Sequence, residues 1–295
     1  MNELPRNRRA VVPARSFDLV ADAYDRGRPA YPDEAVSWLL GSVRHTGHRV
    51  DVVELGAGTG KLTERLLEHD CDVVATDLSE VMLERLRRRA PAARAVAAGA
   101  EQLPVTTRSA DLVVAAQAFH WFDAERVVRE AARVLRPGGQ LAVMWNSRDE
   151  RIPWVKRLGR IIGTNVPEQR GDPTSAIDET GMFETVERAT FRFWQPLDAH
   201  SLRDLVSSRS NVAMMSEFER ERVLRRVNEL YAEYGRMADG MLLPYVTTVC
   251  RAAVLPWALP EEPDPEPVPV TETTEAEPRH RPDSSDDASL LIDFR

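Results

Sequence analysis

Residues 53–63 read V-E-L-G-A-G-T-G-K-L-T and place three closely spaced glycines directly after an apolar run. The run from Val50 to Leu55 has the length and β-branched content of a buried strand, and the residues after Gly60 have helical spacing. A strand, a glycine turn and a helix in this order are typical of a βαβ unit whose turn approaches a nucleotide. The stretch therefore predicts a nucleotide-binding α/β fold and leaves the nucleotide open.

Strand-like apolar runs and amphipathic stretches alternate on both sides of this turn, which predicts a parallel sheet covered by helices. Strands are predicted at 50–55, 72–77, 94–98, 111–116, 140–145, 183–194 and 241–254. Helices are predicted at 60–69, 79–89 and 123–135, with a helical insertion at 199–237. Ser79 and Asp123 supply capping oxygens for two of these helices, and R-P-G-G at 136–139 is a strong helix stop.

The net charge of −8 is concentrated at one end of the chain. Residues 257–295 contain eleven Asp and Glu against three Arg, so the remainder is formally neutral. A neutral body argues against nucleic-acid binding through a broad positive surface. Residues 1–15 are expected to be a flexible basic N-terminus, residues 16–257 the folded domain, and residues 258–295 a disordered acidic tail. The tail's end, S-L-L-I-D-F-R, is apolar enough to dock, and its acidic part could recruit a protein partner.

Other features of the composition indicate the cellular compartment and the kind of organism that we expect for the protein. The apolar runs are strand-length, so no membrane span is expected, and the N-terminus lacks the apolar stretch of an export signal. Two distant cysteines, Cys71 and Cys250, fit a reducing cytoplasm and offer neither a disulfide framework nor a metal cluster. Abundant Ala and Arg beside only two lysines suggest a GC-rich bacterial genome. Monomer and homodimer both remain open.

Three kinds of glycine loop compete for the stretch at 53–63. A phosphate-binding P-loop needs Gly at Leu55 and Ser or Thr at Leu62, and the dinucleotide fingerprint needs Gly at Lys61. The third kind of loop has the pattern E-x-G-x-G-x-G, which the chain matches from Glu54 to Gly60. Its closely spaced glycines would let the backbone approach a bulky adenosyl group. Asp77 ends the next strand and can accept hydrogen bonds from two ribose hydroxyls, a role that NAD sites share.

Further motifs narrow the choice: A-G-A-E-Q-L-P-V at 98–105, D-L-V-V-A-A-Q-A-F-H-W-F at 111–122 and L-R-P-G-G-Q-L-A-V at 135–143. In this order they resemble class I methyltransferases that use S-adenosylmethionine, in the type 11 group with the ubiquinone-biosynthesis and trans-aconitate enzymes. The resemblance covers about residues 17–254. It implies a Rossmann-like, seven-stranded, mostly parallel sheet with helices on both faces and an antiparallel edge strand, and S-adenosylhomocysteine as a product.

The resemblance also implies a set of cofactor-binding residues. In the family the N-terminal segment folds over the cofactor, so Tyr24 would cover the site and Arg28 would pair with the methionine carboxylate. Gln117 would touch the amino-acid portion. The remaining implied contacts are Glu54, Gly56, Ala57, Gly58 and Gly60 in the turn, Asp77 at the ribose, and Leu78, Gly99, Ala100 and Glu101 at the adenine. Relatives often have Asp or Thr at Gly99, so one side-chain contact to the adenine is missing here.

The reaction expected from the resemblance is methyl transfer to a small-molecule acceptor, most readily O-methylation of a carboxylate or hydroxyl. A hydroxyl would benefit from a base, and His120 follows the fourth predicted strand at the carboxyl edge of the sheet, which makes it the candidate catalytic residue. The candidate substrate-binding residues are His120, Trp121, Trp145, Asn146 and Arg209. An NAD-linked oxidoreductase and a non-catalytic scaffold or sensor that binds S-adenosylmethionine remain as alternatives.

Overall fold

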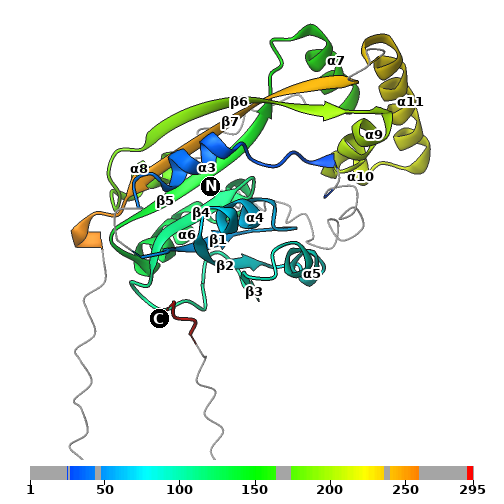
Figure 1. The fold of residues 1–295 in the computed structure, drawn as a ribbon. Coiled ribbons are helices and arrows are strands. Elements are labelled where there is room, and N and C mark those ends of the chain that lie inside the picture. Colours follow the sequence, from blue (N-terminus) through cyan, green and yellow to red (C-terminus); the bar gives the residue numbers. More distant parts are fainter. Residues whose placement is uncertain are drawn as a thin grey trace, which may run out of the picture.

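Figure 1 shows the computed structural model of the chain, which describes residue 25 and residues 27–43, 48–163, 174–235, 240–258 and 291–294. In this part of the chain one sheet has the strand order β3-β2-β1-β4-β5-β7-β6. Its strands are β1 (Val50–Leu55), β2 (Cys71–Asp77), β3 (Arg94–Ala97), β4 (Ala110–Ala116), β5 (Leu135–Arg148), β6 (Glu187–Leu197) and β7 (Met241–Ala253). The first five are parallel, whereas β7 is antiparallel to β5 and β6. The predicted sheet, with an antiparallel strand at one end, is confirmed.

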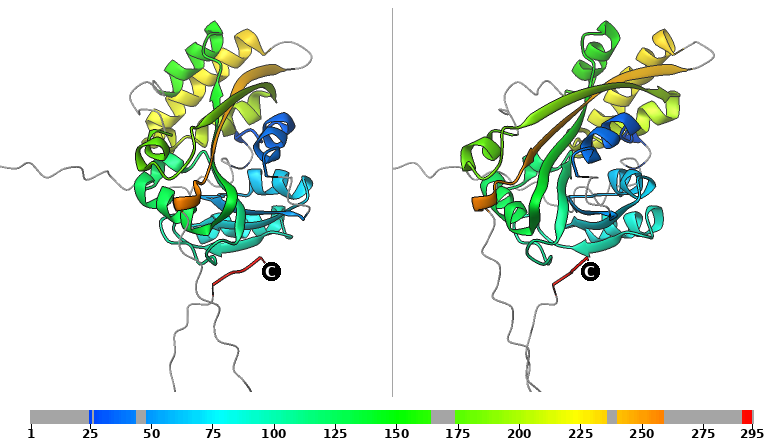
Figure 2. Two further views of the ribbon diagram at one scale, coloured as in Figure 1. Left: turned by 90° about the vertical axis from the view of Figure 1, so that its left-hand side faces the viewer. Right: turned by 60° about the vertical axis from the view of Figure 1, so that its left-hand side comes forward.

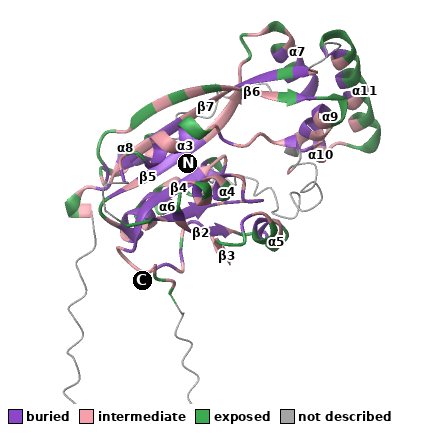
Figure 3. Cartoon of the chain, viewed as in Figure 1, coloured by how far each residue is buried: buried purple, intermediate pink, exposed green. Residues whose placement is uncertain are grey.

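Helices cover both faces of the sheet because its central strands are apolar on both sides. Val52 packs on the side of α3 (Asp33–Leu40), α4 (Lys61–Glu68) and α5 (Glu80–Arg89). Val53, one residue later, packs on the opposite side with α6 (Ala124–Val134) and α8 (Ser175–Thr180). This alternation explains why the strands read as unbroken apolar runs. Figure 3 shows the buried residues gathered along the sheet and on the helix sides that face it.

Two predicted helix starts are confirmed by their caps. The Ser79 hydroxyl accepts a hydrogen bond from the Met82 N–H at 3.3 Å, and the Asp123 carboxylate accepts one from the Arg126 N–H at 3.3 Å. The segment 136–139 ends α6 as predicted, but it forms no loop. It enters β5 through an irregularity opposite Ala110 and Leu112, with Gly138 at φ +80°. The predicted start of this strand at residue 140 is therefore corrected to Leu135.

β5 is longer than predicted, and the ends of β5, β6 and β7 project beyond the other strands of the sheet. Pairing between β5 and β7 continues to Arg148 opposite Tyr245. On the projecting ends lie α7 (Pro153–Ile162), α9 (Ala199–Ser207), α10 (Ser210–Ala213) and α11 (Glu217–Tyr234), which we name the distal helical group. It has an apolar core of its own, in which Val223, Val227 and Leu230 of α11 are buried. The predicted insertion at 199–237 corresponds to α9–α11 as far as residue 235. The predicted strand at 183–194 begins later, at Glu187, and Phe183 makes only an isolated bridge to Val254.

The C-terminus does not follow the prediction of a wholly disordered tail. Ala258 ends a short helical turn, η3 (Pro256–Ala258), that packs on the core, and residues 291–294 lie against the loop before β4. Ile292 and Phe294 bury part of their apolar surface there, which is the physical reason why this end is ordered. The prediction is corrected for these residues. Residues 259–290 and the predicted N-terminal segment 1–15 lie outside the described residues.

Among the described helices, none combines the length and the apolarity needed to cross a bilayer. Cys71 and Cys250 are both buried, and neither forms a disulfide in the described part of the chain.

Candidate functional site

The glycine turn predicted from the sequence joins β1 to α4. Gly56, Gly58 and Gly60 all have left-handed backbones, at φ +63°, +56° and +81°. A Cβ at Gly56 would lie 2.6 Å from the Ala118 Cβ, and one at Gly60 would lie 2.8 Å from the Leu86 Cγ. A Cβ at Gly58 would meet no atom within 4 Å. Two glycines are therefore required by packing, whereas Gly58 faces open space that a ligand can enter.

This difference predicts separate effects for two alanine substitutions. Gly56→Ala combines left-handed strain with a steric clash and is expected to lower the free energy of unfolding by about 2 to 3 kcal/mol. Gly58→Ala adds only the strain, about 1 to 2 kcal/mol, but its methyl group enters the open space and should weaken S-adenosylhomocysteine binding about tenfold. Urea unfolding and calorimetry on both variants measure the two quantities. Equal cofactor affinity in Gly58→Ala and the wild type would contradict the placement of the ligand.

Glu54 is the buried acid behind the turn. It lies in β1, is 1% exposed, and accepts a hydrogen bond from the Thr63 hydroxyl at 2.6 Å. Burial raises the pKa of Glu54 to about 8, the Thr63 hydroxyl acts against this rise, and the charge of Asp77 adds to it. Because Glu54 also lines the cleft described below, its carboxyl group is poised to ionise when a cationic group binds beside it.

Asp77 shapes the turn from the neighbouring strand. It is the last residue of β2, and its carboxylate oxygens accept hydrogen bonds from the Gly58 N–H at 2.8 Å and the Ser79 N–H at 2.9 Å. The Ala57 N–H also donates to the Thr76 carbonyl at 2.9 Å. Each carboxylate oxygen retains accepting capacity for a further donor. The structure thus brings the predicted ribose acid directly to the predicted glycine turn.

The residues predicted at the adenine lie together beyond Asp77. Leu78 is 72% exposed, and a Cβ placed on Gly99 would lie 3.9 Å from the Leu78 side chain and 3.4 Å from the Glu101 carboxylate. Ala100 is buried, and the Glu101 carboxylate accepts a hydrogen bond from the Asp123 N–H at 3.0 Å. An exposed apolar side chain facing a backbone turn with an acidic group beside it suits a flat, hydrogen-bonding base.

An open cleft runs from the glycine turn to the ends of β4 and β5. It is lined by Arg28, Pro29, Tyr31, Glu54, Gly56, Ala57, Gly58, Thr59, Lys61, Leu62, Ala116, Gln117 and Asn146. Six of the predicted cofactor residues and Asn146 from the predicted acceptor set thus line a single cleft.

The N-terminal segment closes one side of this cleft. Arg89 holds it through a two-point contact with Asp25 at 2.6 and 2.8 Å, and also donates to the Thr59 carbonyl at 3.1 Å. Gly27 packs against the Leu205 backbone of α9, and Ala30 accepts a hydrogen bond from Asn146. The segment therefore bridges the glycine turn and the distal helical group, as the resemblance implied. Tyr24, the predicted cover, lies outside the described residues.

Lys61 and Gln117 shape the cleft in ways that the sequence did not reveal. Lys61 begins α4 and lines the cleft; burial and the nearby Arg89 lower its pKa, and the charges of Asp25 and Glu64 oppose this shift. Gln117 has a left-handed backbone at φ +60° and donates through its side chain to the Asn146 carbonyl at 3.0 Å. A non-glycine residue in this conformation is uncommon and is often found at functional sites.

Beyond Asn146 the cleft meets a cluster of arginines. Arg148 ends β5 with only 6% of its side chain exposed, opposite the buried Tyr245 of β7. Burial raises the pKa of the Tyr245 hydroxyl, and the charges of Arg209, Arg148 and Arg28 act against that rise, so all three guanidinium groups lie near enough to influence this hydroxyl. We name Arg28, Arg148 and Arg209 together with Tyr245 the arginine cluster.

Neighbouring residues tie the arginine cluster into the fold. Arg28 donates to the Ser208 hydroxyl at 3.3 Å, and Arg148 lies 3.4 Å from the Glu150 carboxylate. Burial and the charge of Arg28 lower the pKa of Arg148, whereas Tyr245 and Glu150 oppose this shift. Sequence reasoning found Arg28 and Arg209 but missed Arg148. Its position two residues after Asn146, on the same face of one strand, was the available signal.

The other predicted acceptor residues lie elsewhere. His120 and Trp121 are exposed on the short helix η2 (Phe119–Trp121), their ring centroids 4.8 Å apart, and neither is among the residues that line the cleft. Trp145 packs on the α6 side of the sheet, on the face of β5 opposite to Asn146. The structure therefore brings Asn146 and Arg209 towards the cofactor residues and separates Trp145 from them.

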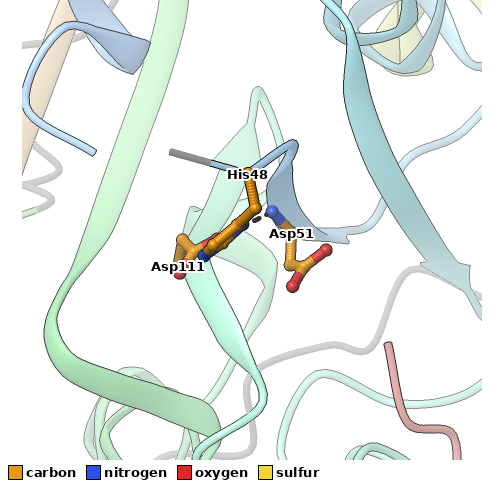
Figure 4. Close-up of side chains that lie close together, drawn as sticks. All are labelled: His48, Asp51 and Asp111. Atoms are coloured by element: carbon orange, nitrogen blue, oxygen red, sulfur yellow. Dashed lines mark hydrogen bonds and ion pairs between the residues drawn. The ribbon is translucent and has the colours of Figure 1, made fainter. Parts of the chain in front are cut away.

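One group of potential metal ligands lies at the opposite edge of the sheet (Figure 4). Ligand atoms of His48, Asp51 and Asp111 lie within 4.8 Å of one another, where β1 and β4 begin. Arg136 already contacts both carboxylates, at 2.7 Å to Asp51 and 3.0 Å to Asp111, and the Asp51 N–H donates to Asp111 at 2.9 Å. The positive charge of Arg136 neutralises the two carboxylates that would otherwise attract a metal ion. This cluster is therefore an ion-pair network that ties β1, β4 and β5 together.

Several known proteins resemble this chain in sequence or in structure. The family model described as a methyltransferase domain matches residues 53–143, from β1 to β5. An uncharacterized methyltransferase of Mycobacterium tuberculosis is 43% identical over 242 residues, which cover 81% of this chain and 96% of that protein. The malonyl-[acyl-carrier protein] O-methyltransferase of Methylococcus capsulatus is 38% identical over 134 residues, 43% of this chain and 48% of that protein. A solved structure from Anaeromyxobacter dehalogenans, assigned as a type II methyltransferase, superposes with a TM-score of 0.56 at 25% identity and covers 79% of this chain and 99% of that one.

Proposed function

The chain belongs to the S-adenosylmethionine-dependent methyltransferases, and from this premise we propose that it methylates a carboxylate oxygen of a small acidic molecule. Its cofactor is S-adenosylmethionine, so the NAD-linked alternative is rejected, as is a purely non-catalytic scaffold. The observation that carries the choice of acceptor is the arginine cluster beside the cleft. Arginine matches a carboxylate in both charge and planar geometry.

The residues of the cleft fit the cofactor. The open space at Gly58 admits a ligand against the backbone, and we assign the ribose to Asp77 and the adenine to Leu78 and Gly99–Glu101. Glu54, with its raised pKa, would hold the ammonium group of the methionine portion. Gln117 and Arg28 line the part of the cleft where that portion would end. When bound, S-adenosylmethionine supplies an electrophilic methyl carbon on a sulfonium centre.

A carboxylate acceptor does not require a catalytic base in the protein. It is ionised at neutral pH, so no side chain has to remove a proton, and the protein must orient the oxygen and exclude water. The nearly buried Arg148 and Tyr245 supply a poorly hydrated surface in which attraction to an anion is strong. The relative from Methylococcus capsulatus, an O-methyltransferase by name, supports oxygen as the methylated atom.

A hydroxyl acceptor with His120 as general base is the second candidate. His120 follows β4 three residues after Gln117, which lines the cleft, so a movement of η2 would bring its ring towards the acceptor. A screen of small mono-, di- and tricarboxylic acids beside phenols, with radiolabelled methyl donor, separates the candidates. Carboxylic acids should be the preferred acceptors, and preference for phenols together with loss of turnover in His120→Ala would favour the second candidate.

The arginine cluster gives the sharper test. Arg209→Gln removes a charged donor and should raise the KM for the acidic acceptor about 10- to 100-fold, the equivalent of about 1.5 to 3 kcal/mol. The KM for S-adenosylmethionine should stay within about twofold, because Arg209 does not line the cofactor cleft. Arg203→Gln, an equal charge change at an exposed position of α9, is the matched control. Equal kinetics in the two variants would contradict the proposal.

A further inference from the structure

The end of the chain docks on the domain as a short added strand. Ile292 forms a parallel bridge with Val105; its N–H donates to the Pro104 carbonyl at 2.8 Å, and its carbonyl accepts from the Thr106 N–H at 2.9 Å. The Thr106 hydroxyl donates to the same carbonyl at 3.0 Å. Backbone pairing of this kind is the way in which extended peptides are recognised at an available strand. The docked segment is Leu291–Phe294.

Side chains give this contact specificity. Ile292 and Phe294 pack against the core on the α6 side, whereas Leu291 points outward and is 55% exposed. Arg94 donates to the Asp293 carbonyl at 2.7 Å, and its guanidinium group lies 4.6 Å from the centre of the Phe294 ring. We name Arg94 together with Pro104–Thr106 the docking surface. The docking surface contacts every second side chain of the extended segment, Ile292 and Phe294, as a strand-binding site does.

Apart from Arg94, which lies in β3, the docking surface belongs to the loop that carries the proposed adenine residues. This loop joins β3 to β4 and spans residues 98–109, with Gly99–Glu101 at one end and Pro104–Thr106 in the middle. From the α6 side, the Glu130 carboxylate accepts from the Leu103 N–H at 2.6 Å, and Arg133 donates to the Val105 carbonyl at 2.9 Å. The C-terminal segment satisfies the polar groups of Pro104 and Thr106 that these contacts leave. The loop is thus held by α6 and by the end of the chain together.

We propose that Leu291–Phe294 is an intramolecular ligand whose docking holds the 98–109 loop and thereby strengthens cofactor binding at Gly99–Glu101. Residues 259–290 separate it from Ala258, and this length of chain can reach about 110 Å when extended. Ala258, Ile292 and Phe294 all pack on the same core cluster, so both ends of the connecting segment lie against one domain. A covalent connection keeps a partner at a constant local concentration, which populates a contact too small to persist between separate molecules.

The test uses the full-length chain with Ile292→Ala and Phe294→Ala combined, since these remove the two apolar anchors. Hydrogen exchange of the Thr106 amide should accelerate about tenfold, because its acceptor is the Ile292 carbonyl. Calorimetry should show S-adenosylhomocysteine binding about fivefold more weakly. A synthetic peptide of residues 284–295, added at millimolar concentration, should restore both values.

Leu291→Ala is the matched control, an apolar truncation in the same segment at an exposed position, and it should leave both values unchanged. Unaltered exchange at Thr106 in the double variant would refute docking in solution. Faster exchange with unaltered cofactor affinity, or a peptide without effect, would refute the coupling. Neither readout uses a methyl acceptor, so both test this proposal independently of the proposed acceptor.

Discussion

Asp77→Ala is expected to weaken S-adenosylhomocysteine binding at least about 100-fold. The substitution removes the acceptor proposed for the ribose hydroxyls, and hydrogen bonds to charged groups contribute about 1.5 to 3 kcal/mol each. It also removes the acceptor of the Gly58 and Ser79 amides, so the glycine turn loses the group that holds its shape. Because both losses act on one site, their effects combine. Titration calorimetry measures the dissociation constant directly.

Glu84→Ala is the control for this substitution, since it removes an equal charge from the helix that follows Asp77. Glu84 lies in α5, 3.7 Å from Arg88, and is more than half exposed. Its removal should leave cofactor binding unchanged within about twofold. A loss below about tenfold in Asp77→Ala would mean that the ribose acceptor is another residue.

Glu54→Gln is expected to abolish a large pH dependence of stability. In the folded chain the pKa of Glu54 is about 8, against an ordinary value of 4.5, so the folded state keeps a proton that the unfolded state releases. Between these values the free energy of unfolding falls as pH rises, by on the order of 4 to 5 kcal/mol in total. The contribution is fully present below about pH 4.5 and is lost as pH rises through about 8. Glutamine mimics the neutral acid and can still accept from Thr63.

Urea unfolding of both proteins at intervals from pH 5 to pH 9 measures this effect. The variant should overtake the wild type in stability as pH rises, and the difference between them should grow by a few kcal/mol across the series. Glu68→Gln, a half-exposed glutamate of α4, should follow the wild type at every pH. Parallel curves for Glu54→Gln and the wild type would show that Glu54 is already ionised in the folded protein.

Features determined by local chemistry were predictable from the sequence. The bounds of β1 agree with the prediction, because a β-branched run between polar residues has few alternatives. Ser79 and Asp123 cap the predicted helices, and the three glycines adopt the left-handed conformation that their spacing indicates. The candidate cofactor site is formed largely by such local elements, which is why the sequence could propose residues for it.

Features that depend on long-range pairing were not predictable. Arg148 becomes part of a strand only because β7 extends far enough to pair with it, and Tyr245 reaches it across that pair. The docking of Ile292 on Val105 joins residues 187 positions apart. The apolar end of the tail indicated that it could dock, but not which part of the chain it would contact. The proposed acceptor side of the cleft is built from such contacts, so the sequence indicated Arg28 and Arg209 singly but not that they lie near each other and near Arg148.

The separate apolar core of the distal helical group makes the enzyme modular. α9, α10 and α11 form one continuous insertion between β6 and β7, and their core does not share residues with the two cores that flank the parallel strands. The glycine turn and Asp77 lie outside this core, so under the proposed function the insertion supplies Arg209 to the acceptor side without carrying any of the proposed cofactor contacts. Grafting the 198–240 segment from a relative between the existing ends of β6 and β7 is therefore a rational route to new acceptor specificity on an unchanged cofactor platform.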